Sequence, residues 1–193
     1  RLTCHAAGAG AALASDLTVQ VNLYIKVRMS PSLPPAPSFS TAQVAHVAGV
    51  ALDTLLTWIK RGNIELMETE MPGRGREREF SLHRLLHIAL VARLAKGGME
   101  VKPASAAALS WSDAGNPHRI PGGLFQTGRT LFVVHHGVGS PDFPPTRIVN
   151  VNGKDPAVSV LAKLFRNPEG DVKSITVVDL NDLDQQVRQK LGL

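Results

Sequence analysis

The fold is decided by the stretch Ser40-Thr41-Ala42-Gln43-Val44-Ala45-His46-Val47-Ala48-Gly49-Val50-Ala51-Leu52-Asp53-Thr54-Leu55-Leu56-Thr57-Trp58-Ile59-Lys60-Arg61. Ser40 is expected to cap a helix over residues 41–48, because its hydroxyl can accept a hydrogen bond from the first turn. Gly49 should end that helix, since glycine readily takes the left-handed conformation that a tight corner requires. A second helix over residues 51–61 follows, so the stretch predicts a helix-turn-helix.

The second helix is expected to be amphipathic. Its apolar residues recur at spacings of three and four, with Trp58 as the bulky anchor of the set Leu52, Leu55, Leu56 and Ile59. We expect this side to pack inward against the first helix, where the small Ala45 permits close approach. The opposite side is polar and consists of Asp53, Thr54, Thr57, Lys60 and Arg61.

A hairpin is predicted after the second helix, because Pro72, Gly73 and Gly75 interrupt residues 63–80. Side chains two apart on a strand share a face, so three arginines of the return strand point together: Arg74, Arg76 and Arg78. Phe80 lies two residues after Arg78, so on a continuous strand its side chain would share the face of these arginines. For its ring to join the core, we expect the strand to break at Phe80.

Over residues 39–111 the sequence resembles the DNA-binding domain of the MerR family of bacterial regulators. The resemblance lies in Ser40-Thr41-Ala42-Gln43-Val44-Ala45, Gly49-Val50, Thr54-Leu55, Trp58-Ile59-Lys60-Arg61-Gly62 and Arg76-Glu77-Arg78-Glu79-Phe80-Ser81-Leu82. It implies that the second helix enters the major groove and that the arginine hairpin, as a wing, follows the phosphate backbone. The candidate DNA-contacting residues are Thr41, Ala51, Thr54, Thr57, Lys60, Arg61, Arg74, Arg76 and Arg78.

The chain departs from the family pattern in two places. Leu56 stands where the family usually has an arginine. No sustained heptad pattern follows Trp111, so the family's antiparallel coiled-coil dimer cannot be assumed for this chain. Residues 39–100 hold eight Lys/Arg against seven Asp/Glu. A nearly neutral domain makes few phosphate contacts, so we expect a homodimer, whose two domains together bind double-stranded DNA with useful affinity.

The composition is that of a globular protein, and its basic balance suits an anionic partner. The 193 residues are 44% hydrophobic and 19% charged, with a net charge of +5 and a pI near 9.7. Cys4 is the only cysteine, which excludes an intramolecular disulfide and fits a reducing cytoplasm. No stretch approaches the roughly 20 apolar residues of a membrane span. A location in the cytoplasm, at the nucleoid, is therefore expected.

The remaining chain divides into further segments. Residues 1–38 are expected to form a disordered leader, with a proline-rich stretch over residues 30–38; Met29 looks like the true start, and a weak signal peptide is the alternative. Helices are predicted over residues 81–96 and 101–111. Apolar groups on two sides of the first predict a second neighbour, either the C-terminal region or another subunit. Residues 112–129 are expected to link the DNA-binding domain to a second domain.

The C-terminal segment, residues 130–193, predicts a small unit of mixed strands and helices. Strands are expected at residues 131–135, 147–151 and 174–180, and helices at residues 156–165 and 182–191. The fold class is therefore α+β. This unit could carry dimerisation or bind a partner or ligand, and the sequence leaves these roles open.

Histidine pairs are the other candidate sites. His83 and His87 lie four apart on a helix, but the sequence places no carboxylate or cysteine to complete a metal site, so a pair on the helix surface is expected. His135 and His136 point to opposite faces of a strand and cannot easily serve one site. We expect no cofactor and no enzyme activity, since no phosphate loop or nucleophile motif occurs.

The function that these patterns favour is sequence-specific DNA binding in transcription regulation. Two alternatives stay open. The module could serve as a phage-like DNA-recognition subunit, of the excisionase or small terminase type. Leu56 and the near-neutral charge also fit a protein-interaction adaptor that kept the helix-turn-helix and lost its DNA affinity.

Overall fold

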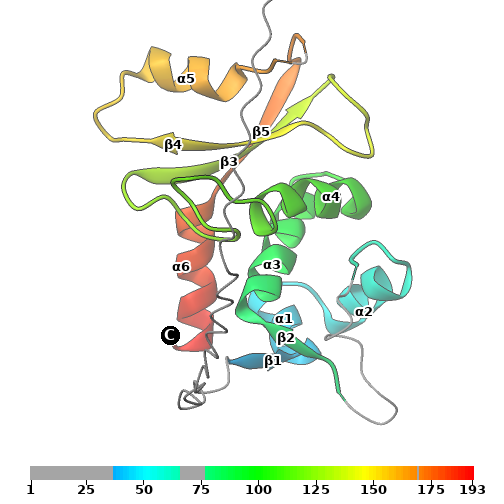
Figure 1. Ribbon diagram of the computed structural model, residues 1–193. Coiled ribbons are helices and arrows are strands. Elements are labelled where there is room, and N and C mark those ends of the chain that lie inside the picture. The colour runs from blue at the N-terminus through cyan, green and yellow to red at the C-terminus, as the bar shows by residue number, and fades with distance from the viewer. Residues whose placement is uncertain (1–36, 66–76, 169) are drawn as a thin grey trace, which may run out of the picture. The chain divides into compact units, whose positions relative to one another are not determined.

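The computed structural model describes residues 37–65, 77–168 and 170–193 (Figure 1). Residues 1–36 of the proposed leader, with the proposed start at Met29, lie outside these residues, whereas Ser38, the last residue of that leader, belongs to a strand. In chain order the elements are β1 (Ser38–Ser40), α1 (Thr41–Ala48), α2 (Leu52–Lys60), β2 (Glu79–Ser81), α3 (Leu82–Lys96), α4 (Val101–Ser112), β3 (Arg129–His136), β4 (Thr146–Val151), α5 (Ala157–Phe165), β5 (Ser174–Asp179) and α6 (Leu180–Leu191). Helices and antiparallel strands are mixed, which confirms the α+β fold class.

The corner between α1 and α2 forms as its residues predict. The Ser40 hydroxyl accepts from the Gln43 backbone nitrogen at 3.3 Å, and the Gln43 side chain accepts in return from the Ser40 nitrogen at 2.9 Å. Gly49 ends α1 with φ of 71°, and the Val50 nitrogen donates to the Ala45 carbonyl. The chain therefore reverses within three residues, and α2 begins at Leu52.

Strand β1, which the sequence did not predict, precedes α1 and forms a two-stranded sheet with β2. β1 pairs antiparallel with β2, and Phe39 lies opposite Phe80; both rings are buried in the same cluster as Val44. The expected break at Phe80 is wrong, because β2 continues through Ser81 and Phe80 is its central residue. Exposure alternates from Glu77 to Ser81, with Arg78 partly buried and Phe80 buried, so Phe80 reaches the core without a break of its own.

Helix α3 is the centre of the fold. Most of its residues are buried, including Ile88 and Val91 on the side away from the apolar stripe. It contacts α1 and β2 of the helix-turn-helix region, and also α4 and α6. The second neighbour that the sequence demanded therefore includes the C-terminal region of the same chain.

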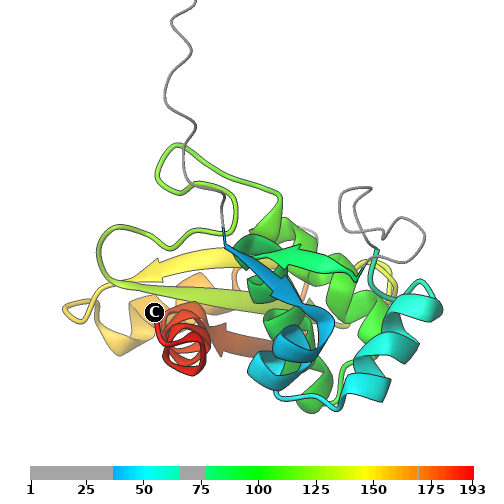
Figure 2. The same ribbon diagram turned by 90° about the horizontal axis from the view of Figure 1, so that it is seen from below.

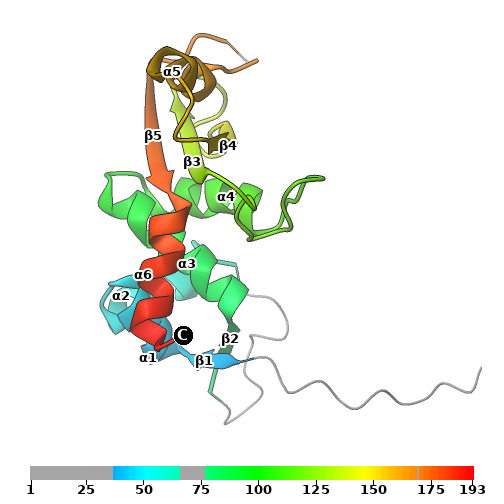
Figure 3. The ribbon, with the colours of Figure 1, turned by 90° about the vertical axis from the view of Figure 1, so that its left-hand side faces the viewer.

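The C-terminal strands form one antiparallel sheet in the order β4-β3-β5. Side chains of β3 alternate between its faces. Phe132 and Val134 join the cluster that contains α3 and α4, whereas Val133 packs with Val149 of β4 and Leu164 of α5. Helices α3 and α5 therefore lie on opposite faces of the sheet, as Figures 1 and 3 show.

Helix α6 leaves the sheet and runs alongside α3 to α1, and Figure 2 shows it end on. Its Leu183 and Val187 are buried in the cluster that also holds Leu55 of α2 and Phe132 of β3. The hydrophobic cluster thus draws residues from both sides of segment 112–129. That this segment separates two domains stays a prediction.

Candidate nucleic-acid interface

Helix α2 is attached to the fold by the fully buried Leu55 and by Trp58 and Ile59, which are partly buried against the same core. This leaves most of its surface open to solvent. The exposed polar residues are those that the sequence singled out, namely Asp53, Thr54, Thr57, Lys60 and Arg61, and Ala51 is exposed at the N-cap. A helix held along one narrow seam presents the rest of its circumference to a partner.

The threonine hydroxyl groups on this surface are small, and one of them already donates a hydrogen bond within the helix. Thr57 Oγ1 donates to the carbonyl of Asp53 at 2.7 Å, so its remaining capacity is to accept. Lys60 and Arg61 place two cations at the C-terminal end of α2, and Asp53 places an anion in its first turn. The long cations are suited to phosphate contact, whereas base contact would depend on Thr54 and Thr57.

The expected apolar side of α2 is wrong in part. Leu52 and Leu56 are 41% and 36% exposed, while Trp58 and Ile59 are partly buried against the core. The physical reason is geometric: α1 and α2 are bent by 110° relative to one another, so α1 covers only one seam of α2. Leu56 therefore lies on the outer surface, where the family pattern usually has arginine.

The remaining candidates lie at two other places. Thr41, at the first position of α1, is partly exposed. Arg78 is partly buried and lines a groove together with Leu56 and Lys60, which brings it beside the C-terminal half of α2. Arg74 and Arg76 lie outside the described residues. The structure thus brings Arg78 of the expected wing next to the second helix.

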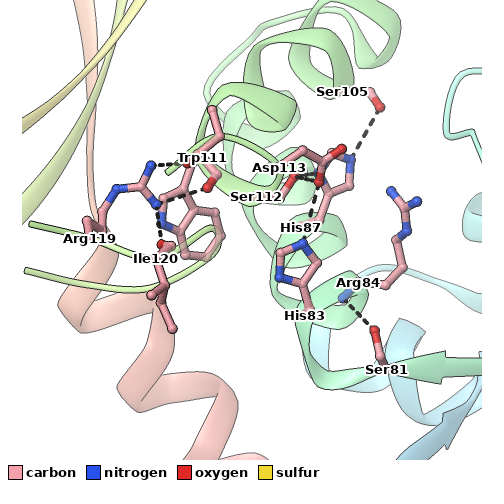
Figure 4. A network of polar contacts seen from close by, with 11 residues as sticks. Ser81, His83, Arg84, His87, Ser105, Trp111, Ser112, Asp113, Arg119 and Ile120 are labelled. Atoms are coloured by element: carbon pink, nitrogen blue, oxygen red, sulfur yellow. Dashed lines mark hydrogen bonds and ion pairs between the residues drawn. The ribbon is translucent and has the colours of Figure 1, made fainter. Parts of the chain in front are cut away.

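Helices α3 and α4 are joined by a polar network (Figure 4). His87 Nδ1 lies 3.0 Å from Ser112 Oγ, and Ser112 donates to Asp113 Oδ1 at 2.8 Å. Because the serine hydrogen is used for Asp113, His87 donates from Nδ1 and its Nε2 is left to accept from Ser105 Oγ, 3.5 Å away. His83 Nε2 lies 3.4 Å from the same Asp113 oxygen.

The network corrects the expectation for the two histidines. His87 is 1% exposed, so the pair does not lie together on the helix surface, and Asp113 supplies a carboxylate from a distant part of the chain. Burial, assisted by the Arg84 guanidinium, lowers the pKa of His87 from 6.5 to about 4. Burial acts to raise the pKa of Asp113, but hydrogen bonds from Ser112 and His83 bring it below its usual value.

This network has the residues of a nucleophilic site without the geometry of one. The carboxylate binds Ser112 and not His87, and Ser112 is 1% exposed, so no substrate reaches its hydroxyl. A neutral His87 with hydrogen-bond partners at both nitrogens instead connects α3 to α4.

Within the described residues, no group of three or more histidines, cysteines or carboxylates could hold a metal ion.

His135 and His136 point to opposite faces of β3, as strand parity predicts. His135 Nε2 lies 2.8 Å from the Leu164 carbonyl of α5, and His136 Nε2 lies 2.8 Å from Thr176 Oγ1 of β5. The two rings therefore join different elements and do not converge on one site.

Arg119 is a buried residue that sequence reasoning missed. Its guanidinium donates to the carbonyls of Trp111 and Ile120, both at 3.0 Å, and also to that of Ala114 (Figure 4). Trp111 Nε1 donates to the Gly123 carbonyl at 3.0 Å. These bonds fix the first half of segment 112–129 against the end of α4. A single arginine in a Gly/Pro-rich segment carries no local signal for this role.

Phe39 was also missed, although it had a usable signal. An apolar residue just before an N-cap often packs against the fourth helical residue, and here Phe39 and Val44 hold those positions in one buried cluster.

No single helix of the described residues is long and apolar enough to cross a membrane. Only α1 and α2 together, as a bent pair, have the length and composition for it.

Comparison with known proteins identifies the helix-turn-helix region. The model of the family described as MerR HTH family regulatory protein matches residues 39–108, from β1 to the middle of α4. No curated protein matches the chain. The matched segment contains the capped α1, the Gly49 corner, the exposed α2 and the central α3. Residues 39–108 of this chain are therefore similar to the helix-turn-helix domain of the MerR HTH family of regulatory proteins.

Proposed function

We propose that this protein is a sequence-specific transcriptional regulator that binds double-stranded DNA as a homodimer, in the cytoplasm at the nucleoid. The observation that carries the proposal is the exposed polar surface of α2, in a domain matched by the MerR family model. Helix α2 enters the major groove, which is wide enough to admit one α-helix. Its attachment through Leu55, Trp58 and Ile59 leaves the polar residues exposed.

Within this interface the residues divide by chemistry. Thr54 and Thr57, with the small Ala51, face the base edges, where they accept hydrogen bonds or contact a thymine methyl. Lys60, Arg61 and Arg78 bind phosphates, as do Arg74 and Arg76 of the wing, and Thr41 contacts the backbone from the start of α1. Phosphate contacts supply affinity and register, whereas sequence choice falls to the few small groups of α2.

The proposal is tested by fluorescence anisotropy with a pool of genomic duplexes across a salt series. The variant Lys60→Ala/Arg61→Ala removes two phosphate contacts from each subunit and four from the homodimer, so we expect weaker binding and a salt slope that is shallower by about 4. Lys154→Ala/Arg166→Ala is the matched control. It removes the same charge from exposed positions after β4 and α5, and should leave the slope unchanged.

The wing is tested in the same assay with the triple variant Arg74→Ala/Arg76→Ala/Arg78→Ala. We expect a loss of affinity and a shallower slope than in the parent protein. Absence of binding by the folded parent at low salt would overturn the DNA-binding proposal.

A second candidate function, protein capture by α2, is favoured by the exposed Leu52 and Leu56. Two leucines on the outer surface of the helix suit an apolar partner better than a phosphate. Salt separates the two functions, because DNA binding falls steeply as salt rises, whereas an apolar contact does not. A partner whose affinity is insensitive to salt and is lost in Leu52→Ser/Leu56→Ser would support capture.

A further inference from the structure

We propose that the outer edge of β5 pairs with β5 of a second copy of this chain, joining two three-stranded sheets into one. β5 is a terminal strand of the sheet, and within the described residues β3 is the one strand that pairs with it. The backbone groups along an open edge are a template for another strand. The segment that pairs with this edge must therefore have an extended backbone.

The two edge strands of the sheet differ in how well they are blocked from pairing with another strand. β4 follows Pro144 and Pro145 and carries Arg147, whose guanidinium donates to the carbonyls of Lys163 and Arg166 at the end of α5. Proline, charge and a covering helix are the usual means of blocking an edge. β5 has none of these over Ser174–Val178, a run without charge or proline, and its Val177 is 41% exposed.

The hydrogen-bond pattern shows which groups of β5 point outward. The His135 nitrogen donates to the Pro145 carbonyl at 2.9 Å, which extends the ladder between β3 and β4. Consecutive residues of a strand bond to opposite sides, so Val134 bonds toward β5, where its partner is Thr176. The backbone groups of Ile175 and Val177 therefore point away from β3, toward the open edge.

A second copy of β5 satisfies these groups in one preferred register. When Thr176 lies opposite Thr176 of the partner subunit, Ile175 lies opposite the partner's Val177, and the pairs form about four backbone hydrogen bonds. At both ends the same register brings Lys173, the residue before β5, toward the partner's Asp179, which also pairs with Arg129 of its own subunit at 2.8 Å. Centring the pairing on Val177 instead would set Ile175 against a carboxylate. Charge and hydrophobicity thus select a two-fold arrangement centred on Thr176.

This inference specifies the interface of the proposed homodimer, and its consequence for DNA binding rests on the proposed function. A two-fold axis perpendicular to the sheet keeps like faces together. Helices α3 and α6, which contact the helix-turn-helix, lie on the face opposite α5 (Figure 3). Both DNA-binding domains then lie on the same side of the joined sheet, as two half-sites on one duplex require.

Sedimentation velocity without DNA tests the pairing. At about 50 μM, where a complex of micromolar Kd is mostly assembled, the full chain should sediment as a dimer. Val177→Pro removes an outward N–H but no bond to β3, so the dimer Kd should rise at least tenfold. Val177→Lys, which sets two ammonium groups near the axis, should do the same if the proline variant fails to fold. Val158→Lys, on exposed α5, is the matched control and should remain dimeric.

A disulfide tests the register. In a Cys4→Ser background, Thr176→Cys should cross-link two subunits on mild oxidation, whereas Val158→Cys should not. A monomeric parent overturns the proposal, as does a dimer that both Val177 variants leave intact and that Thr176→Cys fails to cross-link. DNA is absent from both experiments. A dimer that does not bind DNA would therefore retain the pairing and reject the proposed function, and a monomer that binds DNA would do the reverse.

Discussion

The ammonium nitrogen of Lys190, near the end of α6, lies 2.9 Å from the carbonyl oxygen of Val47, in the last turn of α1. This bond joins residues at opposite ends of the described chain. The last carbonyls of a helix lack partners within it and carry partial negative charge, so a cation there stabilises the helix end. Arg93 of α3 adds a second link to α6, through Gln186 Oε1 at 2.8 Å. The C-terminal helix thus braces the first helix of the DNA-binding domain.

Lys190→Met should lower the free energy of unfolding by about 1 kcal/mol, because it keeps the aliphatic stem and removes one charged hydrogen bond at a partly exposed site. Urea denaturation at pH 7 measures the change. Gln189→Ala, at the exposed neighbouring position, is the control and should be neutral within about 0.5 kcal/mol. Equal effects of the two substitutions would show that the bond to Val47 does not stabilise the fold.

Leu183→Ala should be more costly, with a loss of about 2–5 kcal/mol, because Leu183 is 4% exposed within the cluster shared by α1, α3 and α6. Thermal unfolding followed by the circular dichroism of the helices provides the measurement. Gln185→Ala, an exposed position on α6, is the matched control. A near-neutral Leu183→Ala would mean that α6 does not bury its apolar side in solution.

Gly49→Ala should lower the free energy of unfolding by about 1–2 kcal/mol, through the left-handed conformation alone. The new Cβ would meet no atom closer than Lys190 Nζ at 3.9 Å, so steric overlap adds nothing. Gly153→Ala is a suitable control, since a Cβ there has open space and no positive φ opposes it. We expect that variant to unfold at the parent's urea midpoint or slightly above it.

His87 should make stability fall with acid. Its pKa is about 4 in the folded chain and 6.5 as a free side chain, so the unfolded chain binds the proton more readily. The contribution is complete above pH 6.5 and is lost as the pH falls toward 4, amounting to about 3 kcal/mol. His87→Gln keeps hydrogen bonding without titration. Its unfolding free energy should fall less than the parent's between pH 7 and pH 4, and an identical fall in both proteins would contradict this origin.

The sequence by itself determined the local elements. Ser40, Gln43 and Gly49 specify where α1 begins and ends, because capping bonds and a left-handed glycine involve residues only a few positions apart. The limits of α3, α4 and the three C-terminal strands followed from periodicity to within two residues. The exposed cations of α2, and with them the candidate interface, could also be named from helical spacing.

Only the tertiary structure decided which of these elements meet. The pairing of Phe39 with Phe80, the burial of His87 beside Ser112, and the bond from Lys190 to Val47 each join residues far apart in the chain. The exposure of Leu56 likewise depends on the angle at which α1 crosses α2. Contacts of this kind depend on how several helices and strands share one core, and that packing leaves no mark on the spacing of neighbouring residues.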